Sequence, residues 1–553
     1  MSDPARASDG AAAPAALPEI LGFWHFAQKH PDKPALICEP SGTVVSFGDL
    51  DRMANRASHA LRAQGLADGD GVSICLPNGV GFVAAMLAAL RSGVYFTLIP
   101  AGASASDIAY LCGDSGSKLL LIADGPVADA VAAQLPTTCR LLRSRAGKGS
   151  GGDWERLAAA KPDTLPPGAR PGMEMIYSSG STGRPKGIRR DFQCKTWGEV
   201  DSRNVGALRW LSASAQSVYL STSPLYHSAP FRFLSAFLDA GATAVLMERF
   251  DPGLALDCIE QHGCTHSLWV PTMFSRLLGL APERRAACRT GSMTHAIHGA
   301  APCPRHVKQA MIDWWGPILY EYYSGTEGIG RTFIDSREWL AHPGSVGRPS
   351  GCIVHILGDD GRELPTGQTG DIFFESDVDF AYWNDADKTR QSISPQGWRT
   401  FGDIGHVDAD GYLYLTDRRS FMLISGGVNI YPREVEDNLL LHPAVQDAAA
   451  FGVPDDDLGE VLVAVVQLKD GLRADARLSD EILGHCRHLG GSIKTPKALR
   501  FCEAFPRLDN GKVQKRLLRD RVAGEAKPLG AWSVWENPSA PVIAAAGAAI
   551  SAA

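Results

Sequence analysis

The sequence predicts an α/β protein with a large N-terminal domain, built from two βα-layered subdomains and a β-rich subdomain, and a small mobile α+β C-terminal domain. Three observations support this prediction. Apolar runs alternate with stretches of helical periodicity, closely spaced strand-like runs follow after about Gly347, and a shorter set of α/β elements begins near Asp417. At 553 residues the chain exceeds what one hydrophobic core usually supports, so we expect three or four structural units.

The first predicted elements are a helix and a strand. The helix has apolar residues at helical spacing and ends near Gly65; these residues are Leu50, Met53, Ala54, Ala57 and Leu61. An apolar run over 72–76 follows. Further short apolar runs, separated by stretches long enough for helices, lie at 119–122, 218–220, 244–247, 267–270 and 318–323. This spacing is typical of largely parallel sheets with helices on both faces.

The β-rich part is predicted from strand-like runs at 353–357, 371–375 and 412–416, separated by Asp- and Gly-containing turns. These short, turn-linked runs favour antiparallel pairing. We expect the N-terminal domain over 18–417 and the C-terminal domain over 418–525. The Ala-rich ends, 1–17 and 526–553, have too little bulky apolar content for a core and are expected to be a disordered tail and a flexible tail.

Composition narrows the classes of partner. The chain is 45% apolar and 21% charged, has no window of about 18 unbroken apolar residues and does not begin like a secretory signal, so we expect a cytoplasmic protein with no transmembrane segment. A net charge of −7 without a Lys/Arg block argues against nucleic acid. The 12 cysteines form no Cys-x-x-Cys pair and indicate reduced thiols. The oligomeric state is not fixed by the sequence, which allows a homodimer.

The most informative motif runs from Tyr177 to Gly187 and reads YSSGSTGRPKG. A polyphosphate needs many backbone N–H donors at short range, which glycines make accessible, together with hydroxyl groups and an ammonium group. The loop supplies all three. It differs from the common P-loop, because Pro185 replaces the second glycine and Gly187 follows Lys186 where Ser or Thr would hold magnesium. A plain surface turn is the alternative reading of such residues.

This string resembles the phosphate loop of the adenylate-forming superfamily, which comprises acyl-CoA synthetases, firefly-type luciferases and peptide-synthetase adenylation domains. The resemblance extends from about Pro18 to Arg521, with the motifs in the expected order, and is closest to acyl-CoA ligases. It implies ATP and Mg²⁺ as cofactors and a carboxylic acid as substrate. The ATP-binding residues that it implies are Ser178, Ser179, Gly180, Ser181, Thr182, Gly183, Lys186, Gly299, Ala300, Ala301, Pro302, Glu321, Tyr322, Tyr323, Thr326, Asp403, Arg418 and Lys512.

The resemblance also implies individual roles. In the string EYYSGTEG, Tyr323 would stack on adenine, Thr326 would contact the α-phosphate and Glu327 would ligate Mg²⁺, a hard cation suited to carboxylate and phosphate oxygens. Asp403 and Arg418 would grip the ribose hydroxyls. Solvated surface side chains are the alternative reading of each of these residues taken singly.

The acyl pocket is expected near the PLYH segment, where His227 would lie close to the bound carboxylate. The residues expected to line the pocket are His227, Phe231, Trp269, His298, Gly299, Ser324 and Gly325. The identity of the acid is not readable, and candidates run from fatty acids to aryl, alicyclic or steroid-like acids. Amino acids are disfavoured, because the segment after His227 lacks the Asp that would hold an ammonium group.

In the C-terminal domain, Lys512 is expected to be the adenylation lysine, which stabilises the charge that develops as a carboxylate attacks the α-phosphate. Ser425, Gly426 and Gly427 resemble the thioester-forming segment that binds coenzyme A. The two regions would alternate at the active site by rotation of the domain about a hinge. The hinge is unusual, since Ser420 and Phe421 replace its common charged residues.

Three functions compete at this point. The leading one is an acyl-CoA ligase that forms an acyl-adenylate, with release of pyrophosphate, and then a CoA thioester, with release of AMP. The second is an ATP-dependent amide synthetase that uses the same adenylate with an amine. The third is a non-catalytic nucleotide-binding relative. It is disfavoured by the joint presence of Lys186, Thr326, Glu327, Asp403, Arg418 and Lys512.

Overall fold

The computed structural model describes residues 21–145, 152–178, 185–190, 198, 202–507, 513–525 and 532–535. The expected disordered tail over 1–17 lies outside these residues. The chain forms two compact units: unit 1 comprises 1–175, 191–268 and 289–295, and unit 2 comprises 176–190, 269–288 and 296–553. The predicted boundary at 417/418 is not a border between these units and stays a prediction.

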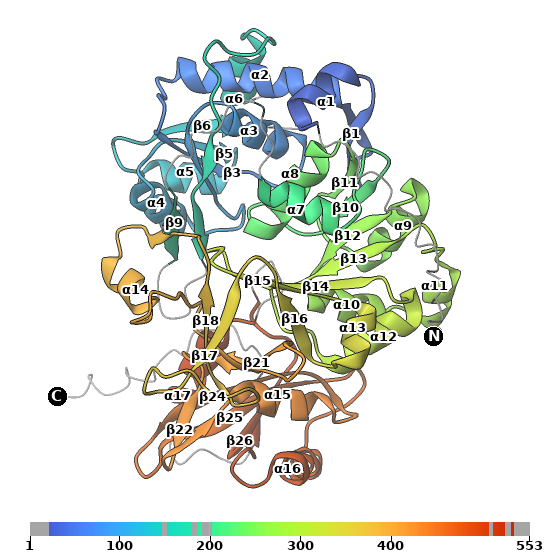
Figure 1. Ribbon diagram of the computed structural model, residues 1–553, viewed down its shortest axis with the longest axis vertical. Coiled ribbons are helices and arrows are strands. Elements are labelled where there is room, and N and C mark those ends of the chain that lie inside the picture. Colours follow the sequence, from blue (N-terminus) through green and yellow to red (C-terminus); the bar gives the residue numbers. More distant parts are fainter. Residues whose placement is uncertain are drawn as a thin grey trace, which may run out of the picture. The chain divides into compact units, whose positions relative to one another are not determined.

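The first sheet of unit 1 has the strand order β6-β5-β3-β4-β7, and all its pairs are parallel. Figure 1 labels β3, β5 and β6 of this sheet. Every residue of β3 is buried, as expected for a central parallel strand in which Ser73 is the one polar side chain. The predicted strands at 72–76 and 119–122 are thus confirmed as β3 and β5. The elements of this part are α2 (Phe47–Ala63), β3 (Gly71–Cys75), α3 (Val80–Leu90), β4 (Tyr95–Leu98), α4 (Ala105–Asp114), β5 (Ser117–Ala123), α5 (Pro126–Ala132), β6 (Arg140–Ser144), α6 (Asp153–Ala159) and β7 (Met173–Glu174).

Helix α2 confirms the first predicted helix. Ser46 caps it by accepting the Asp49 N–H at 3.1 Å, and Leu50, Ala54 and Leu61 are buried. Met53, which was expected on the same face, is 38% exposed. The buried face instead includes the polar residues Asn55 and Ser58, which the apolar pattern does not mark.

A second group of strands in unit 1 has the order β12-β10-β11-β1-β2. Its pairs are parallel except for the edge hairpin of β1 and β2. The predicted strands at 218–220, 244–247 and 267–270 are confirmed. The elements are α1 (Phe23–Lys29), β1 (Pro34–Glu39), β2 (Thr43–Ser46), α7 (Ser202–Trp210), β10 (Val218–Ser221), α8 (Ser228–Asp239), β11 (Thr243–Met247), α9 (Pro252–His262) and β12 (His266–Trp269).

In unit 2 the strands run in the order β17-β18-β20-β21-β16-β15-β14-β13. Only the pair of β13 and β14 is parallel, so the expected change to antiparallel pairing is confirmed. The elements are α10 (Pro271–Leu278), α11 (Pro282–Ala287), β13 (His295–His298), α12 (Arg305–Trp315), β14 (Leu319–Ser324), β15 (Arg331–Asp335), α13 (Ser336–Ala341), β16 (Ser345–Pro349), β17 (Ile353–Leu357), β18 (Gly370–Glu375), β20 (Asp403–Val407) and β21 (Leu413–Arg418).

A small antiparallel sheet in unit 2 has the order β19-β9-β8. It consists of β8 (Ile176–Ser178), β9 (Lys186–Arg189) and β19 (Ala381–Tyr382), and helix α14 (Ala386–Gln391) follows β19. Strands β8 and β9 are the two arms that flank the predicted phosphate loop.

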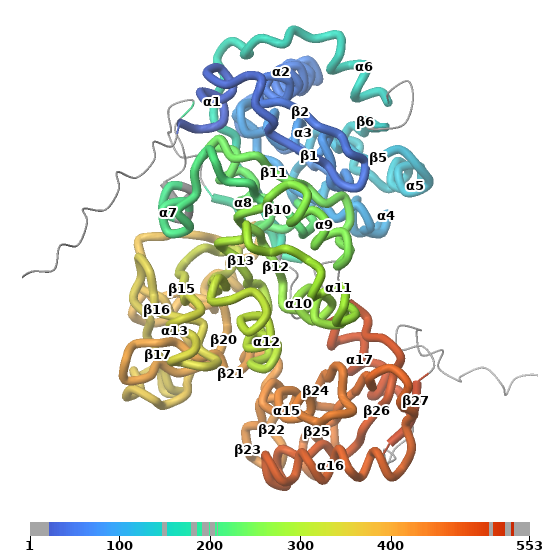
Figure 2. The backbone as a smooth tube through the Cα atoms, turned by 90° about the vertical axis from the view of Figure 1, so that its right-hand side faces the viewer, coloured from blue at the N-terminus to red at the C-terminus, as the bar shows by residue number. Residues whose placement is uncertain are grey.

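The C-terminal part of unit 2 is a sheet of order β23-β22-β25-β26-β27, with β24 also paired to β25 (Figure 2). The alternation of strand residues separates two cores: Ala448 and Ala450 pack with α15 and α16, whereas Ala449 and Phe451 pack with α17. The elements are β22 (Leu423–Ser425), β23 (Val428–Ile430), α15 (Pro432–Leu440), β24 (Val445–Asp455), β25 (Gly459–Leu468), α16 (Ala476–Gly490), β26 (Ala498–Cys502), α17 (Lys515–Ala523) and β27 (Trp532–Trp535).

Strand β27 corrects the expected flexible tail over 526–553. It pairs in parallel with β26, and Trp535 is 5% exposed. Two tryptophans supply the apolar area that the surrounding Ala-rich sequence lacks, which is why these four residues join the sheet. The other residues of 526–553 lie outside the described part of the chain.

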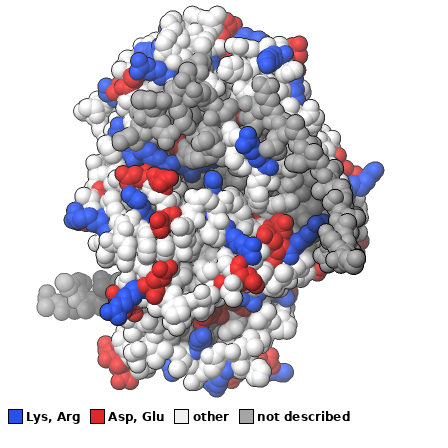
Figure 3. Space-filling model, viewed as in Figure 1, with Lys and Arg blue, Asp and Glu red and all other residues white. Residues whose placement is uncertain are grey.

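Charged side chains are mixed on the surface. On the face shown in Figure 3, the described Lys and Arg residues alternate with Asp and Glu. Among the helices that the structure describes, none combines the length and the hydropathy needed to cross a bilayer.

Candidate active site

Asp403 and Arg418, the pair expected at the ribose, face each other across two antiparallel strands of unit 2. Asp403 begins β20, Arg418 ends β21, and the two are register partners. Arg418 Nε donates to Asp403 Oδ1 at 3.0 Å, and Asp403 is 7% exposed. The hairpin therefore fixes the orientation of a buried carboxylate, which suits an acceptor for hydroxyl groups.

Tyr323 reaches the same carboxylate from the end of β14. Its hydroxyl donates to Asp403 Oδ2 at 2.6 Å, and its ring meets Phe401 edge to face at 5.8 Å between centroids. Burial, and then the charge of Asp403, raises the pKa of Tyr323 well above its ordinary value, so the phenol keeps its proton. Tyr323, Asp403 and Arg418 thus form one hydrogen-bonded chain from three strands.

Glu327, the expected Mg²⁺ ligand, lies in the turn after β14 and is 8% exposed. Tyr382 donates its hydroxyl to Glu327 Oε1 at 2.7 Å, and Arg190 Nη2 donates to the main-chain oxygen of Glu327 at 2.7 Å. Gly325 permits this crowding, because a Cβ there would lie 2.6 Å from Glu327 Oε2. Thr326 is half-buried in the same turn.

The donor set fits a Mg²⁺ ion carried by a nucleotide. Tyr382 occupies one oxygen of Glu327, and the other accepts no hydrogen bond from the described residues. Within the described ranges, no cluster of three or more His, Cys, Asp or Glu side chains could hold a metal ion. A cation at Glu327 would take most of its ligands from phosphate and water, which is the coordination that Mg²⁺ favours.

Lys186, near the end of the predicted phosphate loop, begins β9 and is the register partner of Ser178. Its Nζ pairs with Asp385 Oδ2 at 2.7 Å, and this hydrogen bond lowers the pKa of Asp385 below its usual range. The side chain of Ser178 lies outside the described residues. So do Ser179, Gly180, Ser181, Thr182 and Gly183.

The turn after β13, which is predicted to lie near adenine, leaves no space for a side chain at Gly299. A Cβ on Gly299 would lie 2.7 Å from two ring atoms of Tyr322, so only glycine fits there. Ala300 has φ 67°, a left-handed conformation that is rare outside glycine and tends to mark functional turns. The contact of this turn, including Ala301 and Pro302, with adenine stays a prediction.

Glu321 and His298 lie below this turn in the core. Lys308 Nζ pairs with Glu321 Oε2 at 2.5 Å, and His298 Nε2 is 3.8 Å from the same oxygen. Burial lowers the pKa of His298 well below its ordinary value, so the ring is neutral. His298 and Trp269, both expected in the acyl pocket, are 0% exposed, and Glu321 has a structural partner instead of an open face.

In unit 1, His227 is the residue before α8, and Phe231 lies one turn further on. Phe231 is 3% exposed and packs edge to face with Phe96 at 5.5 Å. Asn78 holds the segment before His227: its Oδ1 accepts the Leu225 N–H at 2.9 Å. The remaining residues expected in the pocket belong to unit 2, so the pocket as a whole stays a prediction.

The predicted residues of the C-terminal part occupy a hairpin and a connection. Ser425 ends β22, and Gly426 and Gly427 form the turn to β23 with φ of 55° and 80°. Ser420, the expected hinge, is exposed after β21. Lys512 lies outside the described residues.

Sequence reasoning missed three residues that contact this constellation: Arg190, Tyr382 and Asp385. The available signals were weak. Asp385 precedes a short helix as its N-cap, and Tyr382 lies in the aromatic run 380–383. Neither pattern indicates which distant residue it contacts, because that depends on the pairing of β9 with β19.

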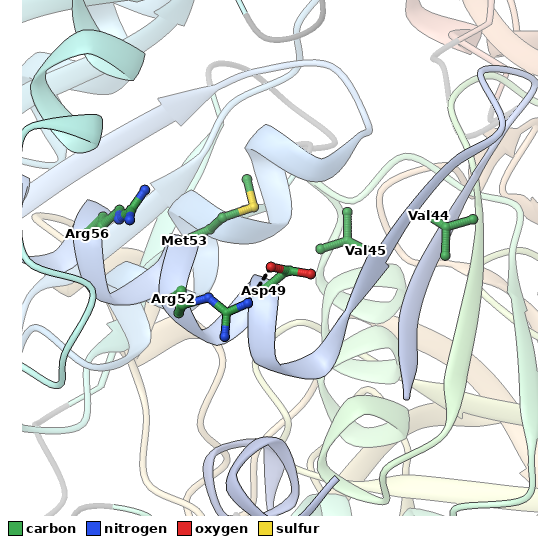
Figure 4. Close-up of a pocket in the computed structure, with 6 residues that line it drawn as sticks. All are labelled: Val44, Val45, Asp49, Arg52, Met53 and Arg56. Carbon is green, nitrogen blue, oxygen red and sulfur yellow. Dashed lines mark hydrogen bonds and ion pairs between the residues drawn. The ribbon is translucent and has the colours of Figure 1, made fainter. Parts of the chain in front are cut away.

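A groove on unit 1 does not belong to this constellation. It has a volume of about 420 Å³ and lies along β2 and α2 (Figure 4); its lining residues are Val44, Val45, Asp49, Arg52, Met53 and Arg56. Asp49 pairs with Arg52 at 2.6 Å, but both side chains are more than half exposed, and such pairs contribute little. No function is assigned to it.

The fold is that of an adenylate-forming enzyme, as comparison with known proteins shows. Residues 23–378 match the AMP-binding enzyme family, and residues 434–512 match the AMP-binding enzyme C-terminal domain. A feruloyl-CoA synthase from Amycolatopsis sp. is 32% identical over 505 residues, covering 91% of this chain and 99% of the relative. The chain therefore belongs to the AMP-binding enzyme family.

Solved structures agree with this assignment. ATP-bound MatB from Rhodopseudomonas palustris matches with a TM-score of 0.79 at 26% identity, covering 90% of this chain and 98% of that one. The amide bond synthetase McbA from Marinactinospora thermotolerans matches with a TM-score of 0.75 at 25% identity, covering 91% and 99%. The predicted fold is confirmed, and so is the predicted enzyme class, an acyl-CoA synthetase.

Proposed function

We propose that this enzyme activates a carboxylic acid with Mg·ATP, forming an acyl-adenylate and pyrophosphate, and then forms a thioester with coenzyme A and releases AMP. The observation that carries the proposal is the hydrogen-bonded chain of Tyr323, Asp403 and Arg418, with Glu327 in the turn that follows Tyr323. In this proposal the ring of Tyr323 stacks on adenine, Asp403 accepts from the ribose hydroxyls, and the carboxylate of Glu327 binds the cation.

In the first half-reaction the carboxylate of the acid attacks the α-phosphate of ATP, its new P–O bond forms, and pyrophosphate leaves. The acid is already ionised at neutral pH, so no general base is needed. Mg²⁺ bound through Glu327 would neutralise phosphate charge. Thr326 and Lys512 would stabilise the charge that develops on the transferring group.

In the second half-reaction the CoA thiol attacks the acyl carbon and AMP leaves. The β22–β23 hairpin supports this acceptor: Gly427 has open space around it, and Ile424 and Val428 are 50% and 41% exposed on either side. An extended thiol arm could lie along such a surface. The feruloyl-CoA synthase, similar over almost its whole length, also favours CoA.

An amine acceptor is the second candidate, because McbA shares the fold and is an amide bond synthetase. Release of AMP separates the two. We expect AMP release to require CoA and to proceed without any amine. The first acid to test is ferulate, followed by fatty, other aryl, alicyclic and steroid-like acids, with pyrophosphate release as the readout.

Lys512→Ala tests whether the lysine acts in the first half-reaction alone. We expect it to reduce acyl-adenylate formation by at least a hundredfold, while thioester formation from supplied acyl-adenylate changes little, because the lysine stabilises charge only in the first step. The two half-reactions are measured separately, by pyrophosphate release and by CoA consumption. Equal losses in both would show that Lys512 does not have this role.

A further inference from the structure

Tyr382 has no role in the chemistry proposed above, although it contacts Glu327. It lies in β19, is 6% exposed, and donates its hydroxyl to Glu327 Oε1 at 2.7 Å. Glu327 is itself 8% exposed. A buried carboxylate with one fixed donor has a restricted orientation, so its second oxygen points in a defined direction.

Tyr382 is in turn held by the elements around it. Its N–H donates to Thr389 Oγ1 at 3.0 Å, and Lys388 Nζ lies 4.6 Å from the centre of its ring. Residue 382 is also paired with Ile188 of β9. The phenol is therefore anchored to the sheet that carries the phosphate-loop lysine.

The same short segment reaches that lysine. Asp385 accepts the Lys388 N–H with Oδ1 at 3.0 Å, which caps α14, and pairs with Lys186 through Oδ2 at 2.7 Å. One short segment, residues 382–385, thus contacts two groups: the Glu327 carboxylate, expected at the cation, and the Lys186 ammonium group, expected at the phosphates.

We propose that Tyr382 is a positioning residue that orients Glu327 toward the nucleotide-bound cation. It touches neither substrate nor cation and acts through the carboxylate. This inference rests on the proposed use of Mg·ATP. It extends the proposed function by assigning a role to a residue outside the nucleotide motifs.

Tyr382→Phe removes only the hydroxyl group. We expect calorimetric titration, in the absence of any acid substrate, to show about tenfold weaker binding of Mg·ATP, because a hydrogen bond to a charged group is lost. Binding of ATP in excess EDTA should change by less than twofold. A role in general folding would weaken both.

Tyr412→Phe is the matched control, since Tyr412 is 4% exposed and donates to Glu338 Oε1 at 3.2 Å. We expect it to leave both titrations unchanged. In a Glu327→Gln background, Tyr382→Phe should cause no further loss of Mg·ATP affinity, because the two residues act as one unit.

The outcomes are distinct. If the wild-type protein does not bind Mg·ATP, the proposed function fails. If the wild-type protein binds Mg·ATP, three results would show that the positioning role is wrong. Tyr382→Phe could bind Mg·ATP as tightly as the wild type, or it could lose as much affinity for ATP in EDTA as for Mg·ATP. It could also add its full loss of Mg·ATP affinity to that of Glu327→Gln. If Tyr382→Phe lowers the unfolding temperature more than the control does, a second variant is needed. Thr389→Val removes the acceptor of the Tyr382 N–H. It must show the same selective loss of Mg·ATP affinity, or the proposal fails.

Discussion

Gly328 shows at the scale of one residue how the site depends on backbone freedom. Its φ is 65°, and a Cβ there would lie 2.4 Å from Arg190 Nη2, the group that donates to the Glu327 main chain. Glycine is therefore required for two reasons, the left-handed backbone and the close guanidinium.

We expect Gly328→Ala to destabilise the protein by about 1–2 kcal/mol through backbone strain and, in addition, to weaken Mg·ATP binding by displacing Arg190. Thermal unfolding and calorimetric titration measure the two effects. Gly411→Ala is the control, because Gly411 has φ 83° but nothing within 4 Å of its Cβ position. It should cause the strain without the binding loss; equal binding losses would contradict the role of Arg190.

Asp403 is the second residue with a specific expectation. It accepts from both Tyr323 and Arg418, and an amide in its place would lose the charge that makes these hydrogen bonds strong. We expect Asp403→Asn to raise the KM for ATP by about tenfold or more, from the loss of about 1.5–3 kcal/mol.

Steady-state kinetics at varied ATP, with the acid saturating, give this measurement. Tyr323→Phe keeps the ring and removes only one of the two donors, so its effect should be smaller. An unchanged KM for Asp403→Asn would exclude Asp403 from the nucleotide site.

At the scale of the element, β27 completes the C-terminal sheet. Trp535 donates its indole N–H to Glu525 Oε1 at 2.9 Å, Arg521 lies 4.5 Å from the centre of its ring, and Arg500, 2% exposed, pairs with the same glutamate. One short strand thus contacts Glu525, the partner of the buried Arg500, and pairs with the edge of β26.

We expect Trp535→Ala to lower the free energy of unfolding of this part of the protein by about 3–5 kcal/mol, the usual cost of deleting a buried tryptophan. Urea-induced unfolding followed by circular dichroism measures it. Val534→Ala, at a position that is 54% exposed on the same strand, should cost little. If the two variants are equally stable, β27 does not contribute to the core.

At the scale of the whole molecule, two stacked histidines link stability to pH. The rings of His266 and His295 lie 4.7 Å apart at 4°, and His266 Nε2 lies 2.9 Å from the Leu211 main-chain oxygen. Burial, and then the charge of His266, lowers the pKa of His295 from 6.5 to about 4, and burial also lowers the pKa of His266.

Between these pKa values the unfolded chain binds more protons than the folded one, so stability rises with pH and is lost as the pH falls from about 6.5 to 4. His295→Phe keeps a stacked ring and cannot titrate. We expect its unfolding temperature to fall less steeply than that of the wild-type protein over this range in scanning calorimetry. His488→Phe, at an exposed position, should keep the wild-type slope; an unchanged slope in His295→Phe would refute the assignment.

Much of the fold was predictable because its signals are local. The run at 72–76 became β3, whose residues are all buried, and the run at 318–323 became β14, which is only partly buried and contains the polar residue Glu321. Strand β27 was missed because two tryptophans in an Ala-rich tail show no periodicity. Their burial depends on an open edge of β26, which no local pattern reveals.

The sequence by itself determined the chemistry. The phosphate-loop string, the EYYSGTEG string and the Asp403 and Arg418 positions each lie in short contiguous motifs, and their resemblance to the family's motifs implies phosphate, cation and ribose as ligands. Tertiary structure alone decided which other groups contact these residues. Tyr382 and Glu327 are 55 residues apart, and Arg190 and Glu327 are 137 apart. Such contacts follow from the register of β9 with β19 and from the packing of distant strands, which are properties of the folded chain and not of any segment within it.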